Sequence, residues 1–172
     1  MPDATNLNYL TFTLDGELYA VNVARVREVL ECSRITRLPR AAAYMKGIIN
    51  LRGSSVPVID LRMKFGLPAL ASHEDSSIVV MELASEEGTL VVGALADDVH
   101  EVLEIPQASI EAAPRFGTRL AAAYIEGLAR RNDDFIVILD VDRVFDEEEA
   151  DELARAAAGL AGASPEAATA TV

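Results

Sequence analysis

The sequence is poor in the residues that build disulfides and metal sites. Among its 172 residues are one cysteine, two histidines and no tryptophan. Because Cys32 stands alone, an internal disulfide is excluded, and its place after a strand-like run indicates a packing residue. His73 and His100 cannot complete a His/Cys metal set with a single cysteine. We therefore predict no metal site, and we expect both histidines to be exposed to solvent.

Sequence patterns of catalytic sites are absent as well. The chain has no glycine-rich phosphate loop of the usual patterns and no serine in a nucleophile elbow. The acidic pairs Asp97-Asp98 and Asp133-Asp134 could bind a divalent cation, but both stand where strands are predicted to turn. Aspartate is common in turns because its carboxylate bonds to the nearby backbone. The sequence therefore predicts a protein that is not an enzyme and carries no cofactor.

Positive charge and long apolar runs are scarce. The net charge is −13, from 15 Lys and Arg against 28 Asp and Glu. Proteins that bind nucleic acid or anionic membrane surfaces carry a clustered basic footprint, and here the basic residues form only small groups. No stretch of about 20 apolar residues is available to cross a bilayer, and the N-terminus lacks the features of a signal peptide. We expect a cytoplasmic protein that neither binds nucleic acid nor inserts into a membrane.

What the sequence does contain is an internal repeat. Residues 44–65 align without a gap to residues 124–145, so that Tyr44, Gly47, Asp60 and Phe65 each meet an identical residue 80 positions later. Two further matches lie upstream in the same order. They pair Val26–Glu31 with Val99–Glu104, and Ile35–Arg40 with Ile110–Arg115. Three matches in one order indicate two copies of a single unit.

Each copy consists of short predicted strands. Alternation of apolar and polar residues and the turn signal Asp15-Gly16 predict a hairpin at the start of the first copy. The predicted strands are Tyr9–Leu14, Leu18–Val23, Val26–Leu30, Ile48–Leu51 and Val56–Leu61, then Ile78–Leu83, Thr89–Ala96, Val99–Leu103, Ile125–Ala129 and Phe135–Val141. A short helical turn is expected at Ala41–Lys46, ended by Gly47. Five short strands with brief links predict a small closed or partly closed barrel per copy.

The copies also set the expected domain boundaries. Residues 8–70 form the first barrel subdomain, whose N-terminal strand could pack with the second, and residues 76–145 form the second. Asp146, with Glu149 three positions on, predicts a capped C-terminal helix within 146–161. Residues 162–172 are small and polar and are expected to be disordered. The acidic run could bind a partner or could simply form a solvated helix.

One turn differs between the copies and is a candidate for function. Asn50–Gly53 in the first copy becomes Arg130–Asp133 in the second. Gly53 suits a positive backbone dihedral at a tight turn, and Arg52 beside it would sit on a short rigid loop. A guanidinium held in this way could anchor a partner protein. It could equally form a local salt bridge, for example to Glu28, and the residues leave both readings open.

The combined motifs resemble those of the CheW family of bacterial chemotaxis coupling proteins. The resemblance covers about residues 8–150, and its most specific parts are Lys46–Gly53 and Val56–Arg62. It implies a mainly β fold of two tandem five-stranded SH3-like β-barrel subdomains around a shared core, with short connecting helices and a C-terminal helix. It also implies a non-catalytic adaptor that couples methyl-accepting chemoreceptors to the histidine kinase CheA. Barrel-to-barrel contacts with the kinase's regulatory domain, and rings with the kinase or with itself, would form at receptor arrays on the inner face of the membrane.

The resemblance also carries over a set of residues that would bind receptor or kinase. They are Val26, Glu28, Gly47, Asn50, Leu51, Arg52, Gly53, Ile78, Val79 and Val99. For the four valine and isoleucine positions, core packing is the open alternative, and for Gly47 it is a backbone requirement. Two alternatives to the function also remain open. One is a related adaptor of a surface-motility or other chemosensory-like pathway, and the other is a barrel-type enzyme or small-molecule sensor.

Overall fold

A computed structural model gives the fold of the chain. It describes residues 6–32, 34–70, 72–85, 88–112, 124–146 and 148–157. The first copy contains the strands β1 (Asn6–Leu14), β2 (Glu17–Asn22), β3 (Val26–Glu31), β4 (Met45–Leu51) and β5 (Ser54–Asp60). The second contains β6 (Ser77–Ser85), β7 (Gly88–Ala96), β8 (Asp98–Pro106), β9 (Ile110–Glu111), β10 (Ile125–Arg131) and β11 (Asp134–Leu139). The fold is mainly β, as predicted, and each predicted strand lies at its expected place.

Short helices fill the connections between strands. They are η2 (Val23–Arg25), α1 (Leu61–Lys64), η3 (Gln107–Ser109) and η4 (Val141–Arg143). The helical turn predicted for Ala41–Lys46 is wrong, because Met45 already begins β4 after a tight turn in which its N–H donates to the carbonyl of Ala42 at 2.9 Å. The C-terminal helix is present at residues 148–157. Residues 158–172, including the tail expected to be disordered, lie outside the described residues.

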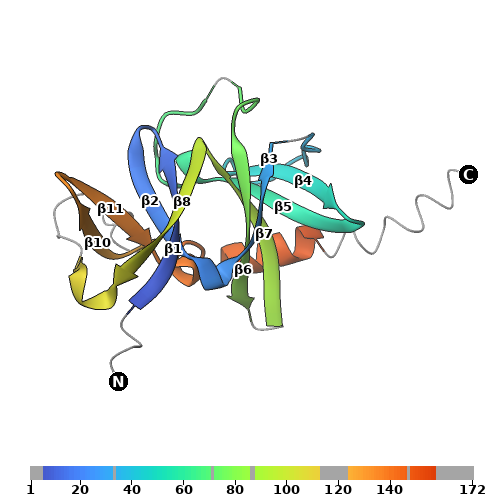
Figure 1. The fold of residues 1–172 in the computed structure, drawn as a ribbon. Coiled ribbons are helices and arrows are strands. Elements are labelled where there is room, and N and C mark those ends of the chain that lie inside the picture. The colour runs from blue at the N-terminus through green and yellow to red at the C-terminus, as the bar shows by residue number, and fades with distance from the viewer. Residues whose placement is uncertain are drawn as a thin grey trace, which may run out of the picture.

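The strands form two sheets side by side (Figure 1). One has the order β8-β1-β2-β11-β10-β9, and the other has the order β3-β6-β7-β5-β4. Each copy therefore gives its first hairpin to the sheet built by the other copy. The division into residues 8–70 and 76–145 does not coincide with the sheets, since β1 and β2 lie with the second copy's strands and β6 and β7 with the first copy's. The option that the N-terminal strand packs with the second barrel agrees with this topology.

The pairings on the two sides correspond one to one. The exchanged hairpins make equivalent parallel pairs, β2 with β11 through Ala20 opposite Ile138, and β7 with β5 through Gly93 opposite Val58. The other strand of each exchanged hairpin makes an equivalent antiparallel pair, β1 with β8 and β6 with β3. Strands of like order thus occupy like places, which confirms the duplication inferred from the sequence.

The repeated residues occupy matching backbone positions. Gly47 and Gly127 each lie at an irregularity where the first strand of a hairpin shifts register. A Cβ on Gly47 would lie 2.0 Å from the carbonyl oxygen of Thr36, and one on Gly127 would lie 2.6 Å from that of Glu111. Neither position can hold a side chain without displacing the neighbouring backbone. The open alternative for Gly47, a backbone requirement, therefore fits its surroundings.

A shared core lies between the two sheets. It combines residues of the exchanged hairpins, such as Phe12 and Val79, with residues that follow the last strand, such as Phe145. Leu153 of the C-terminal helix is 1% exposed and belongs to this central core. Asp146 and Glu149 exchange hydrogen bonds of 3.0 and 2.8 Å at the helix start, which confirms the predicted capping box. Smaller clusters fill each sheet on its own side.

Candidate functional site

The turn between β4 and β5 is a two-residue hairpin loop. Leu51 pairs with Ser54, and both loop residues have positive φ, 50° at Arg52 and 90° at Gly53. Such loops match the twist of antiparallel strands and favour Asn, Asp or Gly at both positions. The Asn50 side chain accepts a hydrogen bond of 2.8 Å from the N–H of Gly53 and fixes the loop. Sequence reasoning placed Gly53 correctly, but it did not foresee that Arg52 is itself left-handed.

Arg52 pairs with Glu28 on the neighbouring β3. Its Nη1 donates to Glu28 Oε1 at 3.2 Å and its Nη2 donates to Oε2, so the contact is bidentate. These hydrogen bonds lower the pKa of the Glu28 carboxyl below its ordinary value. The local salt bridge considered from the sequence is therefore present. The Arg52 side chain nevertheless stays 70% exposed, so its guanidinium also remains accessible to a partner.

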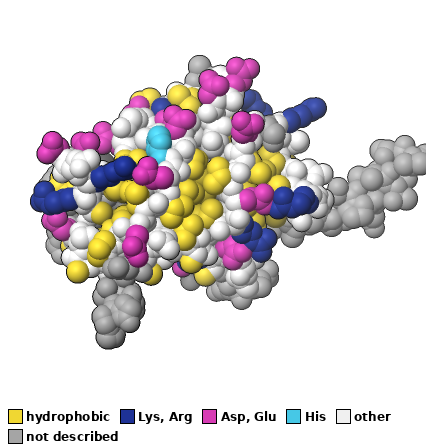
Figure 2. All heavy atoms as spheres, in the orientation of Figure 1, with side chains coloured by type: hydrophobic (Ala, Val, Ile, Leu, Met, Phe, Trp, Pro, Cys, Tyr) yellow, Lys and Arg dark blue, Asp and Glu magenta, His cyan; other side chains and the backbone are white. Residues whose placement is uncertain are grey.

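A strip of apolar side chains follows the outer strands of the two sheets. Val26 on β3 and Val99 on β8 occupy equivalent repeat positions, and both are half-buried against the central core. Three residues further along, Val29 and Val102 are 42% and 49% exposed. We call Val26, Val29, Val99 and Val102 the edge-strand valines. Figure 2 shows hydrophobic side chains gathered across the middle of the visible face, with charged side chains toward its ends.

Sequence reasoning missed Val29 and Val102. The signal that could have found them is the internal repeat. The matched segments Val26–Glu31 and Val99–Glu104 place the two valines at the same position of the repeat. An exposed valine at the same place in both copies could therefore have been inferred, had the exposed face of each strand been assigned.

Two of the predicted contact residues are core residues instead. Ile78 and Val79 on β6 are 0% and 1% exposed. Ile78 packs in the cluster on its own side of the sheet and Val79 packs in the central core. Their side chains cannot touch a partner while the fold is intact, so the expected contact is wrong and core packing holds. The structure brings Glu28, Asn50, Leu51, Arg52 and Gly53 together around the β4–β5 hairpin.

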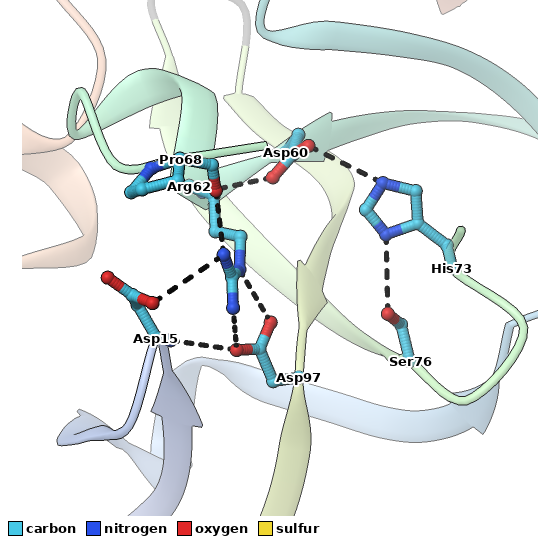
Figure 3. A network of polar contacts seen from close by, with 7 residues as sticks. All are labelled: Asp15, Asp60, Arg62, Pro68, His73, Ser76 and Asp97. Atoms are coloured by element: carbon cyan, nitrogen blue, oxygen red, sulfur yellow. Dashed lines mark hydrogen bonds and ion pairs between the residues drawn. The ribbon is translucent and has the colours of Figure 1, made fainter. Parts of the chain in front are cut away.

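A polar network joins the corner between β7 and β8, and the turn between β1 and β2, to α1 (Figure 3). Arg62 of α1 donates to both carboxylate oxygens of Asp97 at 3.0 and 2.6 Å and to the carbonyl of Pro68 at 2.6 Å. Asp97 also accepts a hydrogen bond of 2.7 Å from the N–H of Asp15 in the β1–β2 turn. Burial alone would raise the pKa of Asp97, but the bonds from Arg62 and Asp15 lower it below its ordinary value.

The second copy contains the same joint with its charges exchanged. Asp142 of η4 stands at the position equivalent to Arg62 and forms a bidentate pair with Arg25 of η2, at 2.9 and 2.5 Å. Asp142 also accepts a hydrogen bond of 3.1 Å from the N–H of Ala84 near the β6–β7 turn. In each copy, one carboxylate thus ties an exchanged hairpin to the sheet that receives it.

His73 is less exposed than the sequence suggested. Its side chain is 17% exposed, with Nε2 at 3.5 Å from Asp60 Oδ2 and Nδ1 at 3.3 Å from the Ser76 hydroxyl. Burial lowers the pKa of His73, although the Asp60 carboxylate acts in the opposite sense. The expectation of full exposure is wrong because the linker folds back over the buried Asp60. His100 is exposed, as expected.

The described residues hold no obvious metal site and no transmembrane helix. Nowhere among them do three His, Cys, Asp or Glu side chains lie close enough together to bind a metal ion. No helix in the described ranges is both long and apolar enough to span a membrane. Asp97 and Asp142 act through ion pairs and hydrogen bonds to backbone N–H groups. The β4–β5 hairpin and two of the edge-strand valines, Val29 and Val102, reach the surface, and such features are suited to contacts with other proteins.

The fold defines a class, that of duplicated-barrel proteins with a shared core. Comparison with known proteins identifies the family. Residues 8–149 match the model of the CheW-like domain, and the chain belongs to this family.

Individual relatives agree over most of the chain. The chemotaxis protein CheW of Klebsiella aerogenes is 33% identical over 141 residues, which cover 82% of each chain. The chemotaxis protein CheW of Bacillus subtilis is 29% identical over 144 residues, 84% of this chain and 90% of its own. The crystal structure of the scaffolding protein TtCheW from Thermoanaerobacter tengcongensis superposes with a TM-score of 0.72 at 35% identity, covering 85% of this chain and 89% of the other. The resemblance drawn from the motifs is thereby confirmed, together with the fold class.

Proposed function

We propose that this chain is a chemotaxis coupling adaptor that joins methyl-accepting chemoreceptors to the histidine kinase CheA. Its relatives are chemotaxis proteins and a scaffolding protein, and it shares their domain over nearly its whole described length. As a scaffold it transmits receptor conformation because one molecule contacts both partners, and no bond of its own changes. It works in the cytoplasm at receptor arrays, where contacts with the kinase's regulatory domain, or with further copies, close into rings.

One observation supports Arg52 as a contact residue. Arg52 adopts a left-handed backbone conformation that disfavours a large side chain, yet its guanidinium is 70% exposed on a turn fixed by Asn50 and Gly53. Strain held in place by the surrounding structure is typical of functional positions. The pairing with Glu28 orients the guanidinium without burying it. We assign Arg52 to the receptor contact, with Glu28 setting its direction.

The edge-strand valines supply the apolar part of the same surface. In the proposed complex the receptor tip is a helical hairpin, which presents apolar side chains at helical spacing, and such helices bind in apolar grooves. Val26 and Val99 would line the floor because they lie half-buried on the central core. The kinase contact would fall mainly on exposed apolar positions of the first barrel's strands, barrel against barrel. Affinity in this arrangement comes from apolar burial, while Arg52 and Glu28 provide orientation and specificity.

Binding measurements with the purified chain test this assignment. A receptor signalling fragment and CheA are each titrated against wild type and Arg52→Ala. We expect receptor affinity to fall by at least about tenfold in the variant, as for a central interface arginine, with CheA binding retained. Arg130→Ala is the matched control, because Arg130 lies in the equivalent hairpin of the second copy and is 68% exposed. Failure of the wild type to bind either partner would sink the adaptor function. Unchanged receptor affinity in Arg52→Ala would sink only the role of Arg52.

A further inference from the structure

A pocket separate from the turn of the β4–β5 hairpin opens beside the end of β3. It has a volume of about 470 Å³, within the range of small-molecule sites. Its walls come from three parts of the chain: the segment after β3, the first residues of β4, and the linker that precedes β6. The lining side chains are Cys32, Arg34, Ile35, Arg37, Lys46, Ser72, His73 and Glu74.

The pocket gathers cations that have no ion-pair partner. In the described part of the chain, eight Lys and Arg side chains pair with carboxylates and five do not. Three of these five, Arg34, Arg37 and Lys46, line the pocket, whereas Arg40 and Arg155 do not. The chain has a net charge of −13, so three unpaired cations around one cavity are a marked local exception. Glu74 is the one carboxylate among the lining residues. Such a cavity concentrates anions from solution.

Backbone contacts hold the walls in place. Thr36 and Ile48 exchange two hydrogen bonds of 2.8 Å, which fix the segment that carries Arg34 and Arg37 against the strand that begins near Lys46. The same segment is joined to the residue before β6, because the N–H of Cys32 donates to the carbonyl of Ser76 at 3.0 Å. The imidazole of His73 lies between the Ser76 hydroxyl, 3.3 Å from Nδ1, and the buried Asp60 carboxylate, 3.5 Å from Nε2. The cations are therefore carried by a preformed frame.

We propose that this pocket binds a phosphate group, either free or carried on a small organic molecule. Three cations against one carboxylate leave a surplus that matches a dianionic phosphate, and arginine provides the forked donors that suit its oxygens. Lys46 adds a compact charge on the strand side. Cys32 and Ile35 offer an apolar wall to an organic substituent. The site is separate from the proposed receptor contact, so the two assignments stand or fall independently.

The two histidines make a direct test possible. The C2–H signal of His73 reports on the pocket, and that of the exposed His100 serves as an internal reference in the same spectrum. Inorganic phosphate and phenyl phosphate are titrated separately into the full chain by NMR at constant pH, with sodium chloride holding the ionic strength constant. We expect a saturable shift of the His73 signal with a midpoint near or below about 1 mM, and no shift of the His100 signal.

Variants distinguish a specific phosphate site from nonspecific electrostatic attraction of anions to the protein. Arg37→Gln/Lys46→Gln removes two of the proposed ligands and should weaken binding at least about tenfold, by analogy with other charge-assisted contacts. Arg40→Gln is the matched control, since Arg40 is exposed on the same segment but does not line the pocket. Tighter binding of phenyl phosphate assigns an organic ligand, and equal binding assigns the free ion. The proposal is overturned if neither probe gives a saturable shift, or if Arg40→Gln weakens binding as much as the double variant.

Discussion

The joint around Arg62 permits a quantitative prediction about stability. Replacement by Met keeps the length of the side chain and its apolar stem but removes all of its donors. Arg62 is 8% exposed, and its guanidinium serves both oxygens of Asp97 and the carbonyl of Pro68. The Asp97 carboxylate would keep one hydrogen bond, from the N–H of Asp15. The substitution therefore leaves a partly buried charge without its counterion.

The size of the effect follows from burial. Removing one partner of a buried ion pair costs about 3 to 5 kcal/mol. The Asp97 side chain is 21% exposed, so water can replace part of what Arg62 supplied, and we expect a loss of about 2 to 3 kcal/mol. For a chain of this size that loss lowers the midpoint of thermal unfolding by roughly 5 to 10 °C. Arg130→Met removes an exposed pair with Glu111 and should cost no more than about 0.5 kcal/mol.

Urea unfolding followed by circular dichroism measures both variants. We expect a lower midpoint for Arg62→Met with an unchanged slope, since the surface exposed on unfolding stays the same. Adding Asp97→Asn removes the carboxylate that Arg62→Met leaves without a counterion, so the double variant should recover part of the lost free energy of unfolding. A cost below about 0.5 kcal/mol for Arg62→Met, equal to that of the exposed control, would refute the view that this pair ties the first hairpin to its sheet.

Three further predictions concern the same framework. Gly47→Ala should cost about 2 to 3 kcal/mol in urea unfolding because its Cβ would meet the Thr36 carbonyl at 2.0 Å, and a neutral result would contradict the close approach. Leu153→Ala should cost about 2 to 4 kcal/mol in the same assay, and a loss near zero would mean that the C-terminal helix does not contribute to the core. The pKa of Asp97 is lowered in the folded state, so its contribution is complete above the ordinary aspartate pKa and is lost as the pH falls through the lower folded value. Stability measured from pH 6 to pH 3 should therefore fall more steeply in the wild type than in Asp97→Asn, and parallel curves would contradict this.

The elements of the fold were predictable from the sequence because their signals are local. Period-two alternation and the Asp15-Gly16 turn locate the first hairpin, and the acidic residues at 146 and 149 locate the start of the last helix. The exchange of hairpins was not predictable. Hydrophobic alternation determines which face of a strand is buried, but it does not determine which copy's strands lie at its edges. The domain boundaries drawn at residues 70 and 76 followed chain order for that reason.

The candidate site was predictable in part. The Asn50–Gly53 turn and its neighbour Glu28 could be named because a rigid loop that differs between the copies stands out against the repeat. Ile78 and Val79 were assigned by resemblance, and their burial depends on a hairpin whose sheet could not be known. His73 was misjudged because its linker looks polar and solvated. Its position depends on Asp60, a buried carboxylate contributed from outside that linker.

The exchanged hairpins also determine the order in which the protein can be completed during synthesis. β1 and β2 leave the ribosome first, yet their partners β8 and β11 end at Pro106 and Leu139. Until those strands arrive, both edges of the first hairpin lack partners, and unpaired edges invite association with other chains. Contacts this distant in sequence also slow folding. The sheet β3-β6-β7-β5-β4 has all of its strands once β7 ends at Ala96, whereas the sheet that receives the first hairpin waits for β11. The first hairpin should therefore depend on protection for most of the chain's translation.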